Sequence, residues 1–187
     1  MNTRHICGVD EVGRGTLAGP VVASAVILQE NHNIEGLKDS KKLSVKNREL
    51  LFPLIIESSM SVGISIVDSQ IIDKLNIRRA TLLAMKNAVL DLTIKPDIVL
   101  VDGMDKIDMN IPNENIIKGD SKVDVIMAAS IIAKVKRDDL MKEYSNKYPE
   151  FGFEKNKGYG TKFHLNALKK NSPSPIHRMT FKPIKKK

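Results

Sequence analysis

The feature that most constrains the fold of this chain is the run VVASAVIL at residues 21–28, which contains no charged side chain. Its length and its content of valine and isoleucine predict a buried strand. Other short apolar segments are expected to join it in a sheet. They lie at residues 4–9, 61–67 and 97–101, with a shorter candidate at 115–117.

Longer segments between these strands have helical patterns. We expect helices at residues 45–58, with Pro53 as an interruption, and at 69–90, with a break near Leu75 and Asn76. The S-x-x-D pattern from Ser121 to Asp124 is a capping signal, so a long helix should begin there and run to about Lys147.

A final helix should follow Thr161 and end near the turn at residues 171–175. Helices that alternate with strands in this way predict an α/β fold with a mixed sheet. The first hairpin should be antiparallel, and the later strands should be parallel and joined by helical crossovers.

The length of 187 residues suits one domain, so we expect residues 1–187 to form a single unit. No apolar stretch reaches the ~18 residues that a membrane span needs, and the first residues do not have the pattern of a signal peptide. The single cysteine, Cys7, excludes an internal disulfide and fits a reducing compartment, most simply the cytoplasm.

Charge is distributed unevenly along the chain, which has a net charge of +8. Residues 1–133 carry 15 Lys+Arg and 17 Asp+Glu, whereas residues 134–187 carry 15 and 5. A basic segment beside a nearly neutral body is typical of a protein with a polyanionic partner such as nucleic acid, although a solvated lysine-rich surface fits equally well. The absence of tryptophan argues against an aromatic stacking platform for single strands.

Two of the expected strands end in acidic residues: Asp10 and Glu11 follow ICGV, and Asp102 follows IVLV. If these strands are parallel neighbours, Asp10 and Asp102 meet at the carboxyl ends of the sheet, where α/β proteins bind ligands. Carboxylates held close together need a cation, and all-oxygen ligands favour Mg²⁺ or Mn²⁺ over Zn²⁺. Such a site suits phosphoryl transfer, but acids that serve only as turn residues fit the pattern equally well.

The sequence alone does not decide whether Glu11 shares a site with Asp10, or whether Asp120 belongs to it. Side chains of adjacent residues on a regular strand point to opposite faces, so Asp10 and Glu11 can share a site only if the strand ends or twists there. Gly13 and Gly15 permit such a bend. Asp120 follows Asp102 by 18 residues, and this spacing alone favours a loop or capping acid.

The segment GVDEVGRGTLAGPVVASAV at residues 8–26 resembles the signature of bacterial ribonuclease HII. Further segments that resemble the family follow in the same order. They are DSKKLS (39–44), NIRRATLLAM (76–85), VLVDG (99–103), KGDSK (118–122), AASIIAKVKRD (128–138), KGYGTKFH (157–164) and SPIHRMTF (174–181).

The resemblance implies a ribonuclease H-like fold, with a mixed five-stranded sheet flanked by helices and a C-terminal helical segment at roughly residues 150–187 that binds substrate. It implies an endonuclease that hydrolyses the RNA strand of RNA–DNA hybrids and nicks duplex DNA 5′ of single embedded ribonucleotides. It also implies two Mg²⁺ or Mn²⁺ ions held by four acids, which map onto Asp10, Glu11, Asp102 and Asp120.

Substrate contacts also follow from the resemblance. The glycine-arginine-glycine loop maps onto Gly13, Arg14 and Gly15 and should contact the 2′-hydroxyl largely through its backbone. The tyrosine that senses the junction between ribonucleotide and deoxyribonucleotide maps onto Tyr159. The arginine at position 14 and the start of the chain at the first strand favour the HII type over ribonuclease HIII.

Several other residues have two interpretations. Lys41, Lys42, Lys122 and Lys157 are candidate phosphate contacts, although each one taken singly fits a plain surface lysine better. His164 and His177 could orient a phosphate or a water, or be structural, and Ser130 is expected to be a small packing residue. The C-terminal motif departs from the family at Ser172, Met179 and Thr180, and Gly160 stands where some members have proline.

Two competing functions remain at this level. In one, the 2′-hydroxyl attacks without metal and histidines act as acid and base, which would leave a cyclic phosphate. In the other, the chain is a hybrid-binding module without catalysis, although clustered acids would repel a phosphate backbone. We expect a monomer that acts on RNA–DNA hybrids and on duplex DNA containing ribonucleotides, with no membrane association.

Overall fold

A five-stranded sheet in the order β3-β2-β1-β4-β5 forms the centre of the computed structural model, which describes residues 4–37, 40 and 42–184. The strands are β1 (Ile6–Val12), β2 (Val21–Leu28), β3 (Ser59–Val67), β4 (Ile98–Asp102) and β5 (Asn113–Ile116). β2 pairs antiparallel with β1 and β3, whereas β4 pairs parallel with β1 and β5. The expected mixed sheet, with an antiparallel first hairpin and parallel later strands, is confirmed, but a loop and not the expected helical crossover joins β4 to β5.

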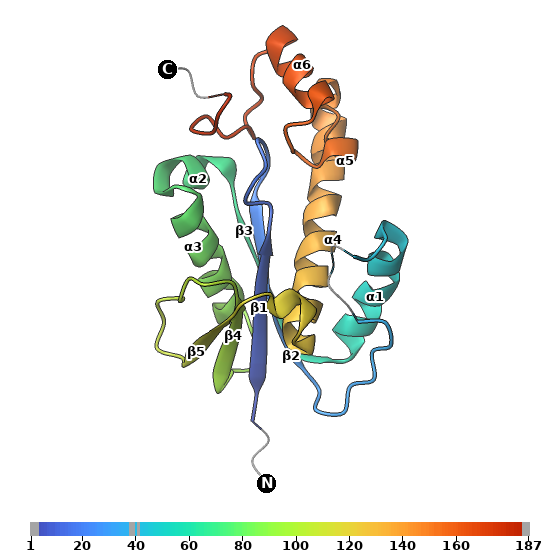
Figure 1. The fold of residues 1–187 in the computed structure, drawn as a ribbon, viewed down its shortest axis with the longest axis vertical. Coiled ribbons are helices and arrows are strands. Elements are labelled where there is room, and N and C mark those ends of the chain that lie inside the picture. Colours follow the sequence, from blue (N-terminus) through green and yellow to red (C-terminus); the bar gives the residue numbers. More distant parts are fainter. Residues whose placement is uncertain (1–3, 38–39, 41, 185–187) are drawn as a thin grey trace.

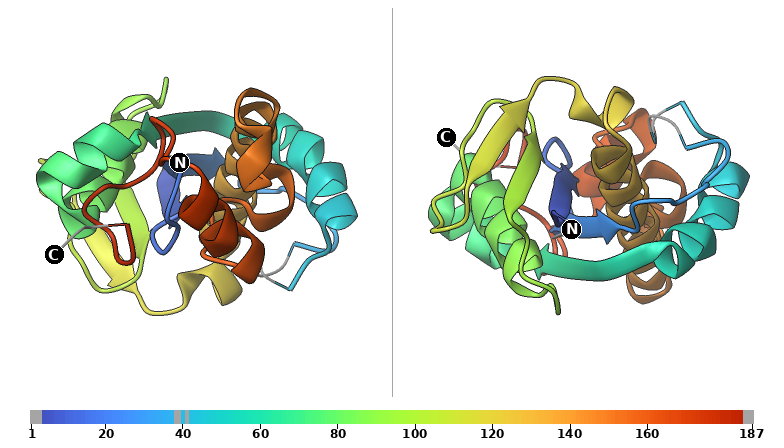
Figure 2. Two further views of the ribbon diagram at one scale, coloured as in Figure 1. Left: turned by 90° about the horizontal axis from the view of Figure 1, so that it is seen from above. Right: turned by 90° about the horizontal axis from the view of Figure 1, so that it is seen from below.

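Helices cover both faces of this sheet (Figures 1 and 2). α4 (Asp124–Lys147) packs on β1 and β2, with α1 (Val45–Glu57) beside it. α3 (Ile77–Leu90) packs on the other face, with α2 (Ser69–Leu75) beside it. Among the described residues, no helix combines the length and the apolar character needed to cross a lipid bilayer.

The alternation of β1 decides which side chains face which helix. Cys7 and Val9 lie in the apolar cluster shared with α3. Gly8 faces α4, and a Cβ added there would lie 2.2 Å from the carbonyl carbon of Val125. Asp10 follows the same alternation as Gly8 and therefore leaves the strand on the side of α4.

Two expected irregularities in the helices have different outcomes. The break between α2 and α3 is confirmed at Asn76, whose φ of 71° is incompatible with a continuous helix. The Asn76 side chain also accepts a hydrogen bond from the amide of Arg79 and so caps α3. Pro53, in contrast, lies inside α1 without ending it.

Two expectations about local structure are wrong. β1 does not end at Asp10, because its pairing with β2 continues through Glu11 and Val12. Ser121 does not cap α4: it lies in the short 3-10 segment η1 (Gly119–Ser121), and its hydroxyl donates to the Lys118 carbonyl. Asp124 is the first residue of α4 and not the partner in a capping box.

The C-terminal part packs on the far end of α4 (Figure 1). It contains η2 (Pro149–Phe151), α5 (Phe153–Asn156) and α6 (Lys162–Lys170), and Thr161 caps α6 as expected. A separate apolar cluster holds this C-terminal part to the turn between β1 and β2. The buried members of the cluster are Ala18, Met141, Phe151, Phe153 and Ala167. This cluster brings the basic C-terminal part next to the glycine-rich turn.

The close approach of α4 to β1 makes Gly8 a test of the fold. Gly8→Ala should lower the free energy of unfolding by about 2 kcal/mol, because the added methyl group meets helix backbone that cannot move alone. Chemical denaturation measures this loss. Gly15→Ala is the matched control, since a Cβ at Gly15 has no neighbour within 4 Å; equal losses in the two variants would contradict the packing explanation.

Candidate functional site

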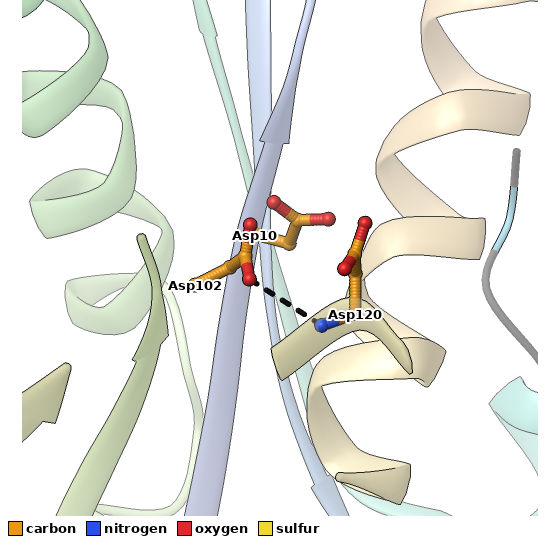
Figure 3. Close-up of side chains that lie close together, drawn as sticks. All are labelled: Asp10, Asp102 and Asp120. Carbon is orange, nitrogen blue, oxygen red and sulfur yellow. Dashed lines mark hydrogen bonds between the residues drawn. The ribbon is translucent and has the colours of Figure 1, made fainter. Parts of the chain in front are cut away.

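Three aspartates from different parts of the chain meet at the carboxyl edge of the sheet (Figure 3). Asp10, Asp102 and Asp120 each offer a carboxylate oxygen, and these oxygens lie within 4.8 Å of one another. The parallel register of β1 and β4 aligns Val9 with Val101, so the residues that follow them lie side by side. The expected convergence of Asp10 and Asp102 is therefore present in the structure.

Asp120 reaches the group through the backbone of η1. The Asp102 Oδ1 atom accepts a hydrogen bond from the amide of Gly119 at 2.7 Å. It also accepts one from the amide of Asp120 at 3.4 Å (Figure 3). These bonds fix the turn and direct the Asp120 side chain, which is 5% exposed, toward Asp10. The loop interpretation of Asp120 is thus correct for its backbone, while its carboxylate belongs to the cluster.

The electrostatics of Asp10 are set by its burial among neighbouring acids. Burial raises the pKa of Asp10 well above its ordinary value, and the nearby charges of Glu11 and Asp102 raise it further. The polar interaction of the carboxylate with the Ser130 hydroxyl opposes this rise in the pKa. A divalent cation among the three aspartates would remove the repulsion, and their all-oxygen ligand set suits Mg²⁺ or Mn²⁺.

Glu11 lies beside this cluster and is not one of its three members. β1 continues through Val12, so Glu11 follows Asp10 on the same strand. Its Oε1 atom lies 3.7 Å from Arg14 Nη1. The charge of Glu11 still acts on Asp10, as the raised pKa shows.

Ser130 does more than fill space in α4. Its hydroxyl interacts with Asp10 and lies 2.8 Å from the hydroxyl of Ser40, in the segment before α1. Both serines are buried. The sequence offered a signal for this role, since Ser130 is the polar residue within the apolar run AASIIA of a helix that faces Asp10.

The turn after β1 is held by two arginines that the sequence analysis did not single out. Arg137 and Arg178 are both fully buried. Arg178 donates to the carbonyl oxygens of Gly13, Arg14 and Gly19. Arg137 donates to the carbonyls of Ala18, Pro20 and Lys157 and to the Thr16 hydroxyl. One signal was available: Arg137 lies four residues from both Ala133 and Met141, on the buried face of α4.

Tyr159 lies in a loop that packs on the same turn. The amide of Leu17 donates to the Gly158 carbonyl at 2.8 Å, and the Tyr159 side chain is 46% exposed. Tyr159 is also near the two buried arginines. Desolvation lowers the pKa of Arg137 and of Arg178, and the interaction with Tyr159 acts to raise both pKa values. The structure thus brings Tyr159 close to the glycine-arginine-glycine turn.

His164 and His177 form a buried pair behind this loop. His164 Nδ1 lies 2.9 Å from the Tyr159 carbonyl, so it must donate, which leaves its Nε2 atom as an acceptor. His177 Nε2, at 2.9 Å from that atom, therefore donates, and His177 Nδ1 accepts from the amide and the hydroxyl of Ser174. Every polar atom of the pair is satisfied only when both rings are neutral.

The candidate phosphate-binding lysines differ in their contacts within the protein. Lys122 Nζ donates to the carbonyl of Ile117, and Lys157 Nζ lies 3.5 Å from the carbonyl of Asp138. Lys42 is exposed, and Lys41 lies outside the described residues. Of the departures in the C-terminal motif, Thr180 has a structural role, because its hydroxyl and amide both donate to Asp73.

The fold and the site together define a class: α/β proteins with a carboxylate cluster suited to divalent cations at the carboxyl edge of a mixed sheet. The family model for ribonuclease HII matches residues 7–184. Ribonuclease HII of Caldicellulosiruptor bescii is 54% identical over 178 residues, covering 95% of this chain and 86% of the relative. That of Enterococcus faecalis is 54% identical over 182 residues, covering 97% and 71%.

Solved structures agree with these sequence relatives. Ribonuclease H2 from Pyrococcus horikoshii superposes with a TM-score of 0.82 at 29% identity, covering 96% of this chain and 94% of that one. The ribonuclease HII in a complex with PCNA from Archaeoglobus fulgidus gives 0.82 at 27% identity, covering 98% of both chains. The chain belongs to the ribonuclease HII family.

The histidine pair predicts a specific pH dependence. Burial and the neighbouring His164 lower the pKa of His177 to about 4, below the value of about 6.5 of an unfolded histidine. The unfolded chain then binds a proton first as the pH falls, so stability should decline by up to about 3 kcal/mol between pH 6.5 and pH 4 and no further below that.

NMR titration of the His177 ring measures the pKa directly. The free energy of unfolding of His177→Gln, which keeps an amide donor toward His164 but does not titrate, should lack this part of the decline. A ring pKa near 6.5 would show that the pair is not held neutral.

Proposed function

We propose that this chain is an endonuclease that hydrolyses the RNA strand of RNA–DNA hybrids and nicks duplex DNA 5′ of single embedded ribonucleotides. The observation that carries the proposal is the cluster of Asp10, Asp102 and Asp120 at the sheet edge of a ribonuclease HII family member. Glu11 is proposed as the fourth acid of the site.

The residues present fit a pair of Mg²⁺ or Mn²⁺ ions. The three aspartates supply oxygen ligands, and the raised pKa of Asp10 reflects burial beside like charges that a cation would relieve. Cations bound there would supply an activated water and neutralise the charge that develops on the leaving oxygen. Asp102 would hold its ligand orientation because the amides of Gly119 and Asp120 fix its Oδ1 atom.

In-line attack of water on the phosphorus leaves a 5′-phosphate and a 3′-hydroxyl. The alternative, metal-free attack by the 2′-hydroxyl, requires a histidine that reaches the substrate. His164 and His177 are 0% and 2% exposed, and both satisfy their ring nitrogens within the protein. This burial supports the hydrolytic reaction over the metal-free one.

We assign recognition of the ribonucleotide to the turn at Gly13, Arg14 and Gly15 and to Tyr159. A Cβ at Gly15 would have no neighbour within 4 Å, so the fold does not require glycine there. Space for a substrate backbone explains the glycine instead. Tyr159 presents a half-exposed ring beside this turn, where it can stack on the sugar that follows the ribonucleotide.

The whole chain, residues 1–187, is proposed to act as one catalytic domain and as a monomer in the cytoplasm. Residues 150–187 would contribute the basic surface that holds the duplex, with Lys41, Lys42 and Lys122 as further phosphate contacts.

The central experiment is an incubation of duplex DNA that contains one ribonucleotide, with and without Mg²⁺. The wild-type enzyme should nick it only with metal and leave a 5′-phosphate. Asp102→Asn should lower the rate more than about 100-fold, because it weakens the metal site, while binding of the duplex is largely kept. A cyclic phosphate at the product end, or wild-type turnover by the variant, would contradict the proposal.

Gly15→Ala tests the recognition turn separately from the chemistry. The methyl group does not disturb the protein, so the free energy of unfolding should stay within about 1 kcal/mol of the wild type. Cleavage at a single ribonucleotide should fall at least about tenfold, because the substrate backbone can no longer approach the turn closely. Unchanged kcat/KM would remove this turn from the substrate contacts.

A further inference from the structure

The guanidinium group of Arg178 captures two successive carbonyls of the glycine-arginine-glycine turn. Its Nη2 atom donates to the Gly13 carbonyl at 2.6 Å, and its Nη1 atom donates to the Arg14 carbonyl at 2.8 Å. The Nε atom and Nη2 also donate to the carbonyl of Gly19, at the other end of the turn. One buried side chain therefore sets the orientation of two consecutive peptide planes.

The direction of the amides follows from peptide geometry. In a planar trans peptide the carbonyl oxygen and the amide hydrogen point in opposite directions. Since the Gly13 and Arg14 carbonyls face inward to Arg178, the N–H groups of Arg14 and Gly15 must face outward. Within the part of the chain that the structure describes, no hydrogen bond uses either of these two amides.

Two successive outward N–H groups form a concave donor pair that suits an oxygen acceptor. The positive charge of Arg178 lies behind the same peptides and adds to the pull of the donors on an acceptor. Arg14 and Gly15 are both exposed, so a substrate can reach this part of the turn.

We propose that Arg178 is a positioning residue for ribonucleotide selection, which aims the Arg14 and Gly15 amides at the 2′-oxygen of the substrate. The inference rests on the proposed function and extends it to a residue that is 0% exposed and 164 positions away from Arg14 in the sequence. Arg178 does not touch the substrate; it acts through the turn.

Arg137 provides a matched comparison. It is equally buried and also binds this turn, but through the carbonyls of Ala18 and Pro20 and the Thr16 hydroxyl. Its loss should destabilise the fold without turning the Arg14 and Gly15 amides. If both arginines were merely structural, the two substitutions would have the same effect on selection.

The experiment compares wild type, Arg178→Met, Arg178→Lys and Arg137→Lys below their melting temperatures. For each, kcat and KM are measured on duplex DNA with one ribonucleotide, and the inhibition constant is measured for the same duplex made only of deoxyribonucleotides. In Arg178→Met the preference for the ribonucleotide duplex over the all-deoxyribonucleotide duplex should fall at least about tenfold. This is the effect expected when one hydrogen bond to the substrate is lost. The affinity of this variant for the all-deoxyribonucleotide duplex should change less than about twofold.

Arg178→Lys should recover part of the preference, because an ammonium group keeps the charge but cannot bind three carbonyls in one plane. Arg137→Lys should keep the wild-type preference. If Arg178→Met does not fold, the intermediate preference of Arg178→Lys carries the test.

The outcomes separate the two proposals. A wild-type enzyme that does not nick the ribonucleotide duplex overturns the proposed function itself. A wild-type enzyme that nicks it, together with Arg178 variants that keep full preference, overturns the role of Arg178 alone. Equal losses in the Arg178→Lys and Arg137→Lys enzymes would also overturn it.

Discussion

The parallel pairing of β1 with β4 is the constraint on which the acid cluster depends. It places Asp10 beside Asp102, and the Asp102 carboxylate then captures the amides of Gly119 and Asp120. α4 packs directly on Gly8, and so lies against the same end of β1 as the cluster. A shift of this register by one residue would send Asp10 to the opposite face of the sheet and separate the cluster.

The three clustered aspartates repel one another at a position where a bound cation would relieve the repulsion. Asp10 and Asp120 are almost completely buried and lie next to a third carboxylate, so the repulsion among the three aspartates opposes folding. A cation that binds only the folded chain adds stability that grows with the logarithm of its concentration once this exceeds the dissociation constant. Affinity for cations and stability of the fold are therefore coupled through the same three side chains.

The sequence predicted most of the fold because the hydrophobic pattern is strong where strands and helices are buried, as in residues 21–28. It also predicted the break between α2 and α3 at Asn76. It placed Asp10 and Asp102 together on the condition that their strands are parallel neighbours, whereas Asp120 needed the family resemblance. It failed at Ser121, which matched a capping signal but lies in η1, where its hydroxyl donates to the Lys118 carbonyl three residues earlier. Arg137 and Arg178 were missed because charged residues are seldom fully buried.

The hydrogen bonds of Arg178 join positions up to 165 residues apart, and thus connect the first hairpin to the segment that follows α6. Contacts of such long sequence separation form late, because the intervening chain must first be organised. During synthesis the sheet and its acids can assemble before residue 178 leaves the ribosome, but the turn beside them cannot take its final shape. With the roles proposed for these residues, a nascent chain would therefore hold its carboxylate cluster before it could distinguish one sugar from another.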